Sequence, residues 1–482
     1  MELIQNYISG QYVNAISDEI IKIYEPATAK VYGELYDSNI EDVNSAVESA
    51  ESAFPSWSAL KVNDRSNYLI AIAEKIHSRL DEFACFESRD TGKPISLARS
   101  LDIPRSISNF KFFAEYAKNF EFELDLNNDE SQNRIMRLPI GVVCCISPWN
   151  LPLYLFTWKI APALVTGNTV IAKPSEITPY TAYLLGDVCS EVGLPPGVLN
   201  IIHGKGPTTG NLLVNHSSIK AISFTGGTST GRLIFKSASN SFKKLSLEMG
   251  GKNPAIIFDD CDYEKMLDTV VRSSFSNQGQ ICLCSSRILI ENSIYEKFKI
   301  DFCLKVSNLI IGDPIEDNTS FGAISSFEQF KKVNDYIDLA VHEGGKILLG
   351  GSQEKINGRC SNGWFIRPTI IEGLESTSRL NQEEIFGPVV TIQPFEAESE
   401  AINIANDTDY GLSATIWTKD LEKARRVSRN IEAGVIWVNC WLLRDLRTPF
   451  GGMKNSGFGR EGGDYAMMFF TEQKNICFQN EF

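Results

Sequence analysis

Histidine and paired cysteines are scarce in this sequence of 482 residues. It has four histidines, and its eleven cysteines are scattered, odd in number and free of any Cys-x-x-Cys pair. Zinc sites draw on clustered cysteine and histidine, and disulfide frameworks on an even set of cysteines. We therefore expect neither a metal site nor a disulfide framework.

Long apolar runs and an excess of positive charge are also missing. No stretch reaches the roughly 18 consecutive apolar residues of a transmembrane helix, and residues 1–10 are too mixed in polarity for a signal peptide. Acidic residues outnumber basic ones by 60 to 46, for a net charge of -14. Such a field repels nucleic acid and anionic membranes. We expect a cytoplasmic protein with neither partner, in which local arginines must meet any anionic substrate.

The length and the 43% hydrophobic content are enough for more than one core, since single domains seldom exceed about 300 residues. Residues 41–120 place apolar side chains such as Val43, Ala46 and Val47 at helical spacing. The Asp90–Pro94 turn interrupts this region. The helical spacing on either side of this turn predicts helices that cover a core formed further along the chain.

Strand-like and helix-like stretches alternate after Pro139. Apolar strands are predicted over residues 141–146, 169–172, 199–203 and 221–224, and Thr178-Pro179 is typical of a helix start. This alternation predicts βαβ units and a parallel sheet, which binds dinucleotides at the carboxyl ends of its strands. The adjacent Cys144 and Cys145 fall inside a strand and are given no chemistry.

Informative residues follow several of these strands. Lys173 and Glu176 leave the sheet together; an ordinary surface ion pair would look the same. A glycine-rich segment that includes Gly206 and Gly210 follows another strand, with spacing that is weak evidence by itself. The Gly226-Gly227 pair opens a further helix, where bare amides can approach a phosphate.

Cys282 is the candidate nucleophile. It follows a polar bend at Gly279, although a cysteine is more often a small buried apolar residue. About thirty residues upstream, Glu248 stands just before Gly250-Gly251. These two segments resemble the aldehyde dehydrogenase superfamily. Its cysteine motif is asparagine or a similar residue followed by Gly-Gln-x-Cys, with Gln278 at the first position here, and its base motif is Leu-Glu-x-Gly-Gly-Lys.

The resemblance extends over nearly the whole chain and implies a fold and a division into domains. The fold class is α/β, with a Rossmann-type NAD-binding domain (1–120 and 139–249), an α/β catalytic domain (250–450) and a small β oligomerisation arm (121–138 and 465–482). The tail from Tyr465 to Cys477 is expected to be a strand. A homodimer or homotetramer is implied.

The resemblance also implies roles for residues of this chain. Cys282 forms a thiohemiacetal and then a thioester, Glu248 is the base, and Asn150 donates to the developing oxyanion together with the Cys282 amide. NAD is the implied cofactor; Glu176 favours it because a carboxylate repels the 2′-phosphate of NADP. The implied cofactor-binding residues are Trp149, Lys173, Glu176, Gly206, Gly210, Gly226, Gly227, Glu384 and Phe386.

One further segment narrows the substrate. Residues 437–452 and the Cys282-Leu283-Cys284 sequence resemble the 2-hydroxymuconic and 2-aminomuconic 6-semialdehyde dehydrogenases. These enzymes act on aldehydes that carry a distant carboxylate, and the resemblance assigns Arg105 and Arg444 to that group. It also places Trp158 and Leu151 at the substrate.

Three alternatives remain open at this stage. Arg105 and Arg444 can instead pair with protein carboxylates, for which Asp102 and Asp445 are near in sequence. The enzyme can be a general aliphatic or betaine-type aldehyde dehydrogenase, or, remotely, a thiol hydrolase that uses Cys282. Cys284 is expected to pack rather than to react.

Overall fold

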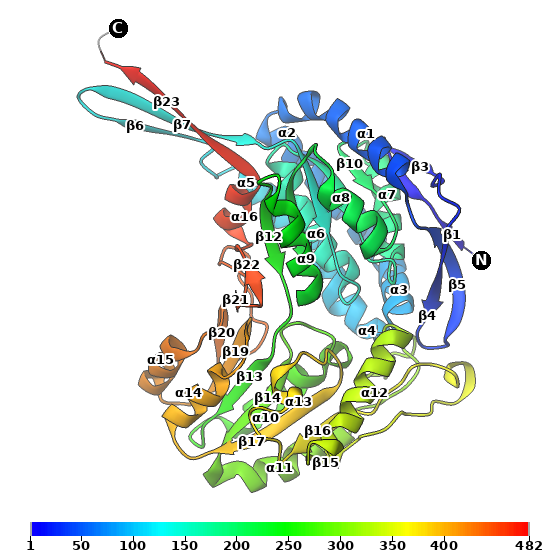
Figure 1. Ribbon diagram of the computed structural model, residues 1–482, viewed down its shortest axis with the longest axis vertical. Coiled ribbons are helices and arrows are strands. Elements are labelled where there is room, and N and C mark those ends of the chain that lie inside the picture. Colours follow the sequence, from blue (N-terminus) through cyan, green and yellow to red (C-terminus); the bar gives the residue numbers. More distant parts are fainter. Residues whose placement is uncertain (1, 481–482) are drawn as a thin grey trace.

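The computed structural model describes residues 2–480 and consists of two lobes and a projecting arm (Figure 1). The first lobe contains an eight-stranded sheet in the order β22-β12-β11-β8-β9-β10-β2-β3. Its central strands are parallel. The strands are β2 (Asn6–Ile8), β3 (Gln11–Val13), β8 (Val142–Ile146), β9 (Thr169–Lys173), β10 (Leu199–Ile201), β11 (Ile219–Thr225), β12 (Lys244–Glu248) and β22 (Gly457–Phe458).

Helices cover both faces of this sheet because alternate strand residues point to opposite sides. Val143 and Cys145 pack with one group of helices, and Val142 and Cys144 with the other, so the two adjacent cysteines belong to different cores. The helices of this lobe are α1 (Ile40–Ser58), α2 (Val62–Ser78), α3 (Leu80–Thr91), α4 (Ile95–Leu97), η1 (Ala98–Asp102), α5 (Ile103–Ala117), α6 (Pro152–Val165), α7 (Tyr180–Glu191), η2 (Gly206–Gly210), α8 (Asn211–Asn215), α9 (Thr228–Ser239) and α16 (Gly463–Phe469).

The strands predicted between residues 141 and 224 are all present, as are the helices of residues 41–120. The predicted start of α7 was wrong in one detail. Thr178 does not cap the helix; its hydroxyl donates to the Trp149 carbonyl at 3.2 Å. Asp90 of α3 caps α7 instead, accepting from the Tyr180 N–H at 2.9 Å, a partner that lies 90 residues away.

The second lobe contains a seven-stranded sheet in the order β15-β16-β17-β14-β13-β19-β20. Its strands are β13 (Asn253–Ile257), β14 (Ser285–Glu291), β15 (Lys346–Leu349), β16 (Thr369–Glu372), β17 (Val389–Phe395), β19 (Ser413–Trp417) and β20 (Val435–Val438). Its helices are α10 (Tyr263–Phe275), η3 (Ser276–Gly279), α11 (Asn292–Ser307), α12 (Phe327–His342), η4 (Gly358–Cys360), α13 (Arg379–Gln382), α14 (Glu398–Asn406) and α15 (Leu421–Asn430).

Three smaller sheets complete the fold. The N-terminal sheet contains β1 (Glu2–Ile4), β4 (Ile20–Glu25) and β5 (Lys30–Tyr36), and β18 (Tyr410–Gly411) pairs with β21 (Met453–Lys454). The arm is a sheet of β6 (Glu123–Asn127), β7 (Ser131–Pro139) and β23 (Thr471–Gln479) that extends away from both lobes (Figure 1).

The strand expected from Tyr465 begins later than predicted. Residues 463–469 form α16 because Ala466, Met467 and Phe470 pack into the core of the first lobe, a helical spacing. Residues 481–482 of the predicted arm lie outside the described residues. Within the described part of the chain, no helix has both the length and the apolar character needed to span a membrane.

Candidate active site

The loop before Cys282 has an unusual backbone. Asn277 (φ 51°), Gln278 (φ 56°) and Gly279 (φ 70°) are three successive left-handed residues between α10 and β14. Only glycine fits the third position, since a Cβ on Gly279 would lie 2.2 Å from the Gly387 carbonyl oxygen. The Asn277 side chain compensates by donating to the Asn150 and Gln280 carbonyls at 3.0 and 3.2 Å. This geometry delivers Cys282 to the space between the lobes.

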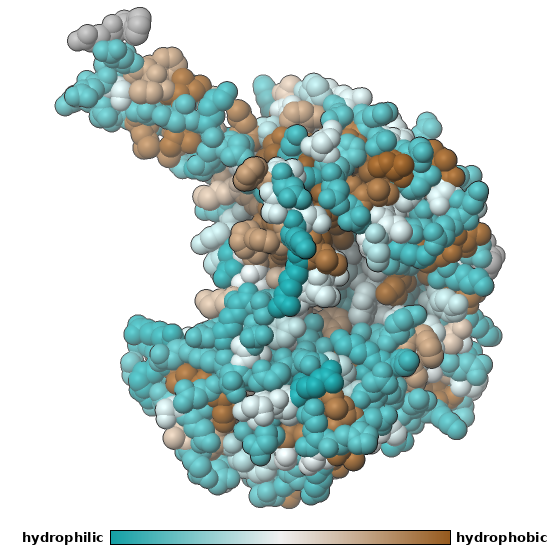
Figure 2. All heavy atoms as spheres, in the orientation of Figure 1, coloured by the Kyte–Doolittle hydropathy of each residue, from teal (hydrophilic) through white to brown (hydrophobic). Residues whose placement is uncertain are grey.

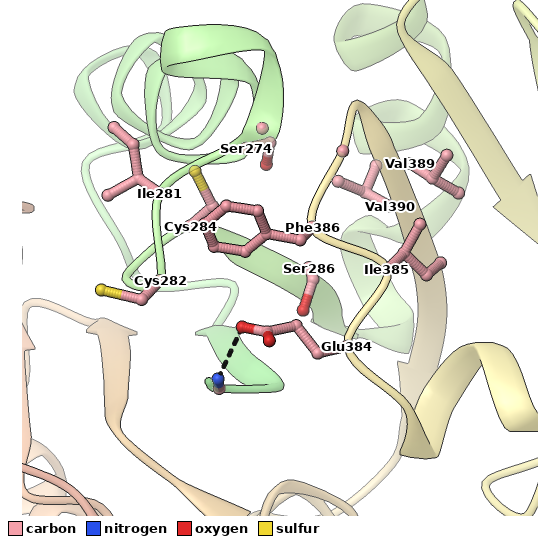
Figure 3. A pocket seen from close by; sticks show the side chains of 13 residues that line it. Ser274, Ile281, Cys282, Cys284, Ser286, Glu384, Ile385, Phe386, Val389 and Val390 are labelled. Carbon is pink, nitrogen blue, oxygen red and sulfur yellow. Dashed lines mark hydrogen bonds between the residues drawn. The ribbon is translucent and has the colours of Figure 1, made fainter. Parts of the chain in front are cut away.

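Cys282 lines two cavities. The larger extends to Arg105 and Arg444; the smaller is lined by Glu384 and Phe386 (Figure 3). The pKa of the Cys282 thiol is raised above its usual range, first by burial and then by the nearby carboxylates of Glu384 and Glu248. At neutral pH the resting thiol is protonated, so a base must activate it.

Glu248 ends β12 and lines the larger cavity together with Cys282. Both of its carboxylate oxygens are buried and have no hydrogen-bond partner among the described residues. Burial, and then the charge of Glu461, hold the pKa of Glu248 well above its usual range, against the opposing effect of Lys159. A buried carboxylate with a raised pKa and free oxygens is suited to accept a proton.

A second buried carboxylate, Glu461, lies beside Glu248 and differs from it by being fully paired. It accepts from Lys159 Nζ and Trp158 Nε1, each at 2.7 Å, and from Ser223 Oγ at 3.2 Å. Trp158 and Lys159 come from α6, in which every residue is buried. The sequence did not reveal the pairing of Lys159 with Glu461, because the two residues lie about 300 positions apart. The only signal in the sequence was that Glu461 ends a glycine-rich segment.

Asn150 links the first lobe to the cysteine loop. Its side-chain Nδ2 donates to the Gln280 carbonyl at 2.8 Å, two residues before Cys282. Its own carbonyl accepts from Lys93 Nζ at 3.1 Å and from Asn277 at 3.0 Å. The described residues give the Asn150 amide group this one acceptor, which leaves its second N–H for a substrate oxygen.

The carboxyl ends of the first-lobe strands offer a place for a dinucleotide. Lys173 ends β9, and its Nζ lies 3.5 Å from Glu176 Oε2. A Cβ on Gly206 or Gly227 would meet nothing within 4 Å, so these backbones border open space that a ligand can approach. The buried hydroxyls of Thr225 and Thr228 lack a partner in the described chain. These features fit a nucleotide at the start of α9.

Gly210 and Gly226 are placed differently. A Cβ on Gly210 would make an ordinary contact with Lys173 at 3.8 Å, whereas one on Gly226 would lie 2.5 Å from the Phe224 ring. Gly226 is therefore needed for packing as well as for any ligand. Sequence reasoning also missed Asp37, which accepts from the Lys205 N–H at 2.7 Å and the Thr209 hydroxyl at 3.0 Å and so holds the η2 loop.

The smaller cavity brings together two of the predicted cofactor-binding residues, Glu384 and Phe386. Glu384 accepts from the Gly251 N–H at 2.9 Å, the dashed line in Figure 3. Phe386, at φ 60°, packs edge-on against Trp149 with ring centroids 5.3 Å apart. Cys284 is buried and points toward Ser274, away from the direction of the Cys282 side chain (Figure 3).

The far end of the larger cavity holds two arginines around one tyrosine. The guanidinium groups of Arg105 and Arg444 lie 5.6 and 5.8 Å from the Tyr154 ring centroid. Arg444 also donates to the Tyr154 hydroxyl and lies over the rings of Trp158 at 4.8 Å and Phe450 at 4.5 Å. Leu151 lines the same cavity.

Neither arginine pairs with the carboxylate that its sequence position suggested. Asp102 forms an ion pair with Lys93, and Asp445 forms one with Arg447. Across residues 2–480, no carboxylate lies within ion-pair distance of Arg105 or Arg444. Two unneutralised cations therefore face a cavity whose other end is a thiol.

A half-buried thiol, a buried carboxyl without a hydrogen-bond partner and a side-chain amide lie next to a sheet whose strand ends can hold a nucleotide. Together they define an NAD-dependent enzyme that oxidises aldehydes. The described residues contain no cluster of metal-ligating side chains.

The chain belongs to the aldehyde dehydrogenase family, whose profile matches residues 12–476. It is 49% identical to 2-aminomuconic semialdehyde dehydrogenase of Danio rerio, with 98% of each chain covered. It is 42% identical to 2-hydroxymuconic semialdehyde dehydrogenase of a Pseudomonas species, with 99% of each covered. The structure of betaine aldehyde dehydrogenase from Staphylococcus aureus in complex with NAD+ superposes with a TM-score of 0.96 at 36% identity, covering 99% of this chain and 95% of that one.

Proposed function

We propose that this enzyme oxidises a semialdehyde that carries a distant carboxylate, such as 2-hydroxymuconate or 2-aminomuconate 6-semialdehyde, to the corresponding acid. The observation that carries the proposal is the pair of unneutralised arginines, Arg105 and Arg444, at the far end of the cavity that begins at Cys282. A planar guanidinium binds a carboxylate through two parallel hydrogen bonds. The names of the relatives agree with this substrate class.

The first half of the reaction builds a covalent adduct. Glu248 takes the proton of the Cys282 thiol, and the sulfur attacks the aldehyde carbon. The carbonyl oxygen becomes an oxyanion that accepts hydrogen bonds from the Asn150 side chain and the Cys282 N–H; losing one such donor typically costs about 3 kcal/mol. When bound, NAD supplies the acceptor for the hydride that leaves this carbon.

The second half releases the acid from the Cys282 thioester. After releasing the thiol proton to solvent, Glu248 takes a proton from a water molecule, whose oxygen attacks the thioester carbon. The C–S bond breaks, and the departing sulfur takes the proton that Glu248 has just accepted. Glu248 is suited to this step because its two oxygens have no other partner among the described residues.

We assign the cofactor-binding roles to the residues at the edge of the first sheet and in the smaller cavity. Lys173 and Glu176 would hold the adenosine ribose, Gly226 and Gly227 the pyrophosphate, and Glu384 the nicotinamide ribose. Trp149, Phe386, Gly206 and Gly210 would border the cofactor. Glu176 supports NAD over NADP because its carboxylate repels a 2′-phosphate.

The betaine alternative requires a cavity that attracts a quaternary ammonium. Tyr154, Trp158 and Phe450 are the kind of side chains that bind such a cation, but the Arg444 guanidinium already lies over all three rings. A cationic substrate would meet two positive charges here. The thiol hydrolase alternative lacks a base of the usual kind, because none of the four histidines lines either cavity.

The test is a specificity ratio: kcat/KM for a muconic-type semialdehyde divided by kcat/KM for an uncharged aldehyde of similar length. We expect Arg105→Ala and Arg444→Ala each to lower the ratio about 10-fold to 100-fold through KM, as expected for a lost hydrogen bond to charge. Arg447→Ala is the matched control, since Arg447 lies in the same loop but pairs with Asp445. Equal losses on both substrates would leave an aldehyde dehydrogenase of unspecified substrate.

We further propose that the protein works as a cytoplasmic homodimer or homotetramer, and that the arm and α9 form the contacts. The arm is a three-stranded sheet with mostly exposed strands, including Leu126 and Phe478. Such a sheet is marginal without a covering partner. Helix α9 and the segments beside it expose Leu233, Phe235, Phe242 and Phe458.

A further inference from the structure

Lys93 is a fully buried cation that the reaction described above does not use. It comes from the Asp90–Pro94 turn after α3. Its ammonium group contacts Asp102 Oδ2 in a short ion pair, the Asn150 carbonyl at 3.1 Å and Glu87 Oε1 at 3.7 Å. Burial of an ammonium is costly, so two hydrogen-bond acceptors with a third carboxyl group nearby indicate a site in which the position of this ammonium matters.

One partner of Lys93 belongs to the substrate end of the cavity. Asp102 and Arg105 both line that cavity. They are three residues apart where η1 runs into α5, a spacing at which a carboxylate and a guanidinium on a helix pair readily. Asp102 forms its ion pair with Lys93 instead of with Arg105. Arg105 is thereby left with its charge available to a substrate.

The other partner belongs to the reacting end. The Asn150 carbonyl is held between Lys93 and Asn277, and the Asn150 side chain reaches the Gln280 carbonyl. A displacement of about 1 Å in such a donor can cost roughly 100-fold in rate. Lys93 is thus one of two donors that fix where the Asn150 amide points.

The protonation state of Glu87 sets the net charge of the buried cluster around Lys93. Burial, against the opposing charge of Lys93, raises the pKa of Glu87 to about 7. Its Oε2 accepts from the Thr181 hydroxyl at 3.0 Å, while Oε1 faces Lys93 without a hydrogen bond. When Glu87 holds its proton, as the raised pKa favours, Lys93 and Asp102 remain as a balanced pair.

We propose that Lys93 is a positioning residue that serves both ends of the substrate site: it keeps Asp102 from neutralising Arg105, and it holds Asn150 at the oxyanion. The first half of this inference rests on the proposed carboxylate-bearing substrate. The second half holds for any aldehyde.

The two effects separate in a set of three variants assayed with the carboxylated and the uncharged aldehyde. Lys93→Met should lower kcat for both aldehydes about 10-fold to 100-fold through Asn150, and should also lower the specificity ratio about as far as Arg105→Ala does, because Asp102 can then pair with Arg105. Adding Asp102→Asn should restore the ratio to the wild-type value and leave kcat low. Asp102→Asn alone should keep the ratio, because it leaves no carboxylate at this position to pair with Arg105.

A purely structural role of Lys93 cannot explain recovery of the specificity ratio when Asp102→Asn is added to Lys93→Met. If Lys93→Met lowers activity and the ratio does not recover in the double variant, while Arg105→Ala still lowers it, the inference about Lys93 is wrong and the proposed substrate stands. If Arg105→Ala leaves the ratio unchanged, the proposed substrate is wrong.

Removing one member of a buried pair is strongly destabilising, so thermal unfolding and NAD binding are measured for each variant. Should Lys93→Met fail to fold, the double variant, which removes both charges, carries the test. A wild-type kcat in that variant would overturn the role at Asn150, and a ratio below the wild-type value would overturn the role at Arg105.

Discussion

At the residue scale, the site contains two carboxylates, Glu248 and Glu461, with different hydrogen-bonding surroundings. Glu248 and Glu461 are both buried near the thiol, but Glu461 accepts three hydrogen bonds and Glu248 accepts none from the described residues. The paired carboxylate remains anchored, and its charge helps raise the pKa of its neighbour. Two side chains of one type thereby acquire different chemistry from their surroundings.

Replacing Glu248 by glutamine should expose its part in releasing the product. We expect Glu248→Gln to slow thioester hydrolysis more than thiol activation, because a thiol loses its proton more readily than water does. NADH should then rise, more slowly than in wild type, to about the enzyme concentration, and turnover should be slowed about 100-fold or more, the usual scale for general-base catalysis. Intact mass measured at that point should show the acyl group on Cys282. Turnover near the wild-type rate with neither burst nor adduct would mean that another group activates the water. Cys282→Ala, which should show neither, is the control.

The same raised pKa predicts opposite effects of pH on rate and stability. Thioester hydrolysis in the wild type should speed up as pH rises through the raised pKa of Glu248, because only the carboxylate form accepts a proton. Over the same window, from the ordinary value of 4.5 upward, the folded state holds a proton that the unfolded state has lost. Stability from this group is therefore lost as pH rises, and Glu248→Gln should unfold at a higher temperature than wild type at alkaline pH.

At the scale of elements, the sequence predicted most of the first sheet because buried parallel strands are continuous apolar runs bounded by glycine and proline. It could not predict interactions between distant segments. Asp90 caps α7, and Asp37 holds η2 from more than 160 residues away. The motifs nominated Cys282, Glu248 and Asn150 as candidates, and the structure places them near one another. The ion pair between Asp102 and Lys93 could be found only from the fold.

Glycines in the loops proposed to bind the nucleotide illustrate the same limit, since the sequence does not show which of them are needed for the fold. Gly204 has φ +147°, and a Cβ there would lie 1.9 Å from Thr209 Oγ1 and 2.7 Å from Asp37 Oδ1. We expect Gly204→Ala to lose about 1 to 3 kcal/mol of stability and to weaken NAD binding, because the η2 loop must move.

Gly227→Ser is the matched comparison. Gly227 precedes α9 with φ -68°, and a Cβ there would meet nothing within 4 Å. Serine at a helix N-cap is at least as stable as glycine, by a few tenths of a kcal/mol. Thermal unfolding of this variant should match wild type, and a cofactor titration followed by fluorescence measures NAD affinity in both. Equal loss of stability in the two variants would contradict this assignment.

At the scale of the whole molecule, two surfaces are hard to explain for an isolated chain. Figure 1 shows the arm extending away from both lobes. Within the arm, nine residue pairs join β23 to β7. Figure 2 shows apolar side chains gathered in the middle of the face that carries α9 and β12, between the arm and the second lobe. Leu233 on α9 is 66% exposed, and Phe242, between α9 and β12, is 95% exposed. Exposed apolar side chains that cluster mark contact surfaces.

The last prediction therefore concerns assembly. If α9 forms an interface between copies of this chain, Leu233→Lys combined with Phe242→Lys should shift the protein to a lower mass in size-exclusion chromatography with light scattering, since each lysine would bury an unpaired charge. Ile300→Lys on α11 is the control, because Ile300 is 65% exposed but lies on the second lobe, away from α9. It should leave the mass unchanged. A wild-type monomer, or an unchanged mass in the α9 variant, would refute the proposed interface. The dissociated variant should also lose thermal stability, because the apolar side chains that the interface covers would become exposed to water.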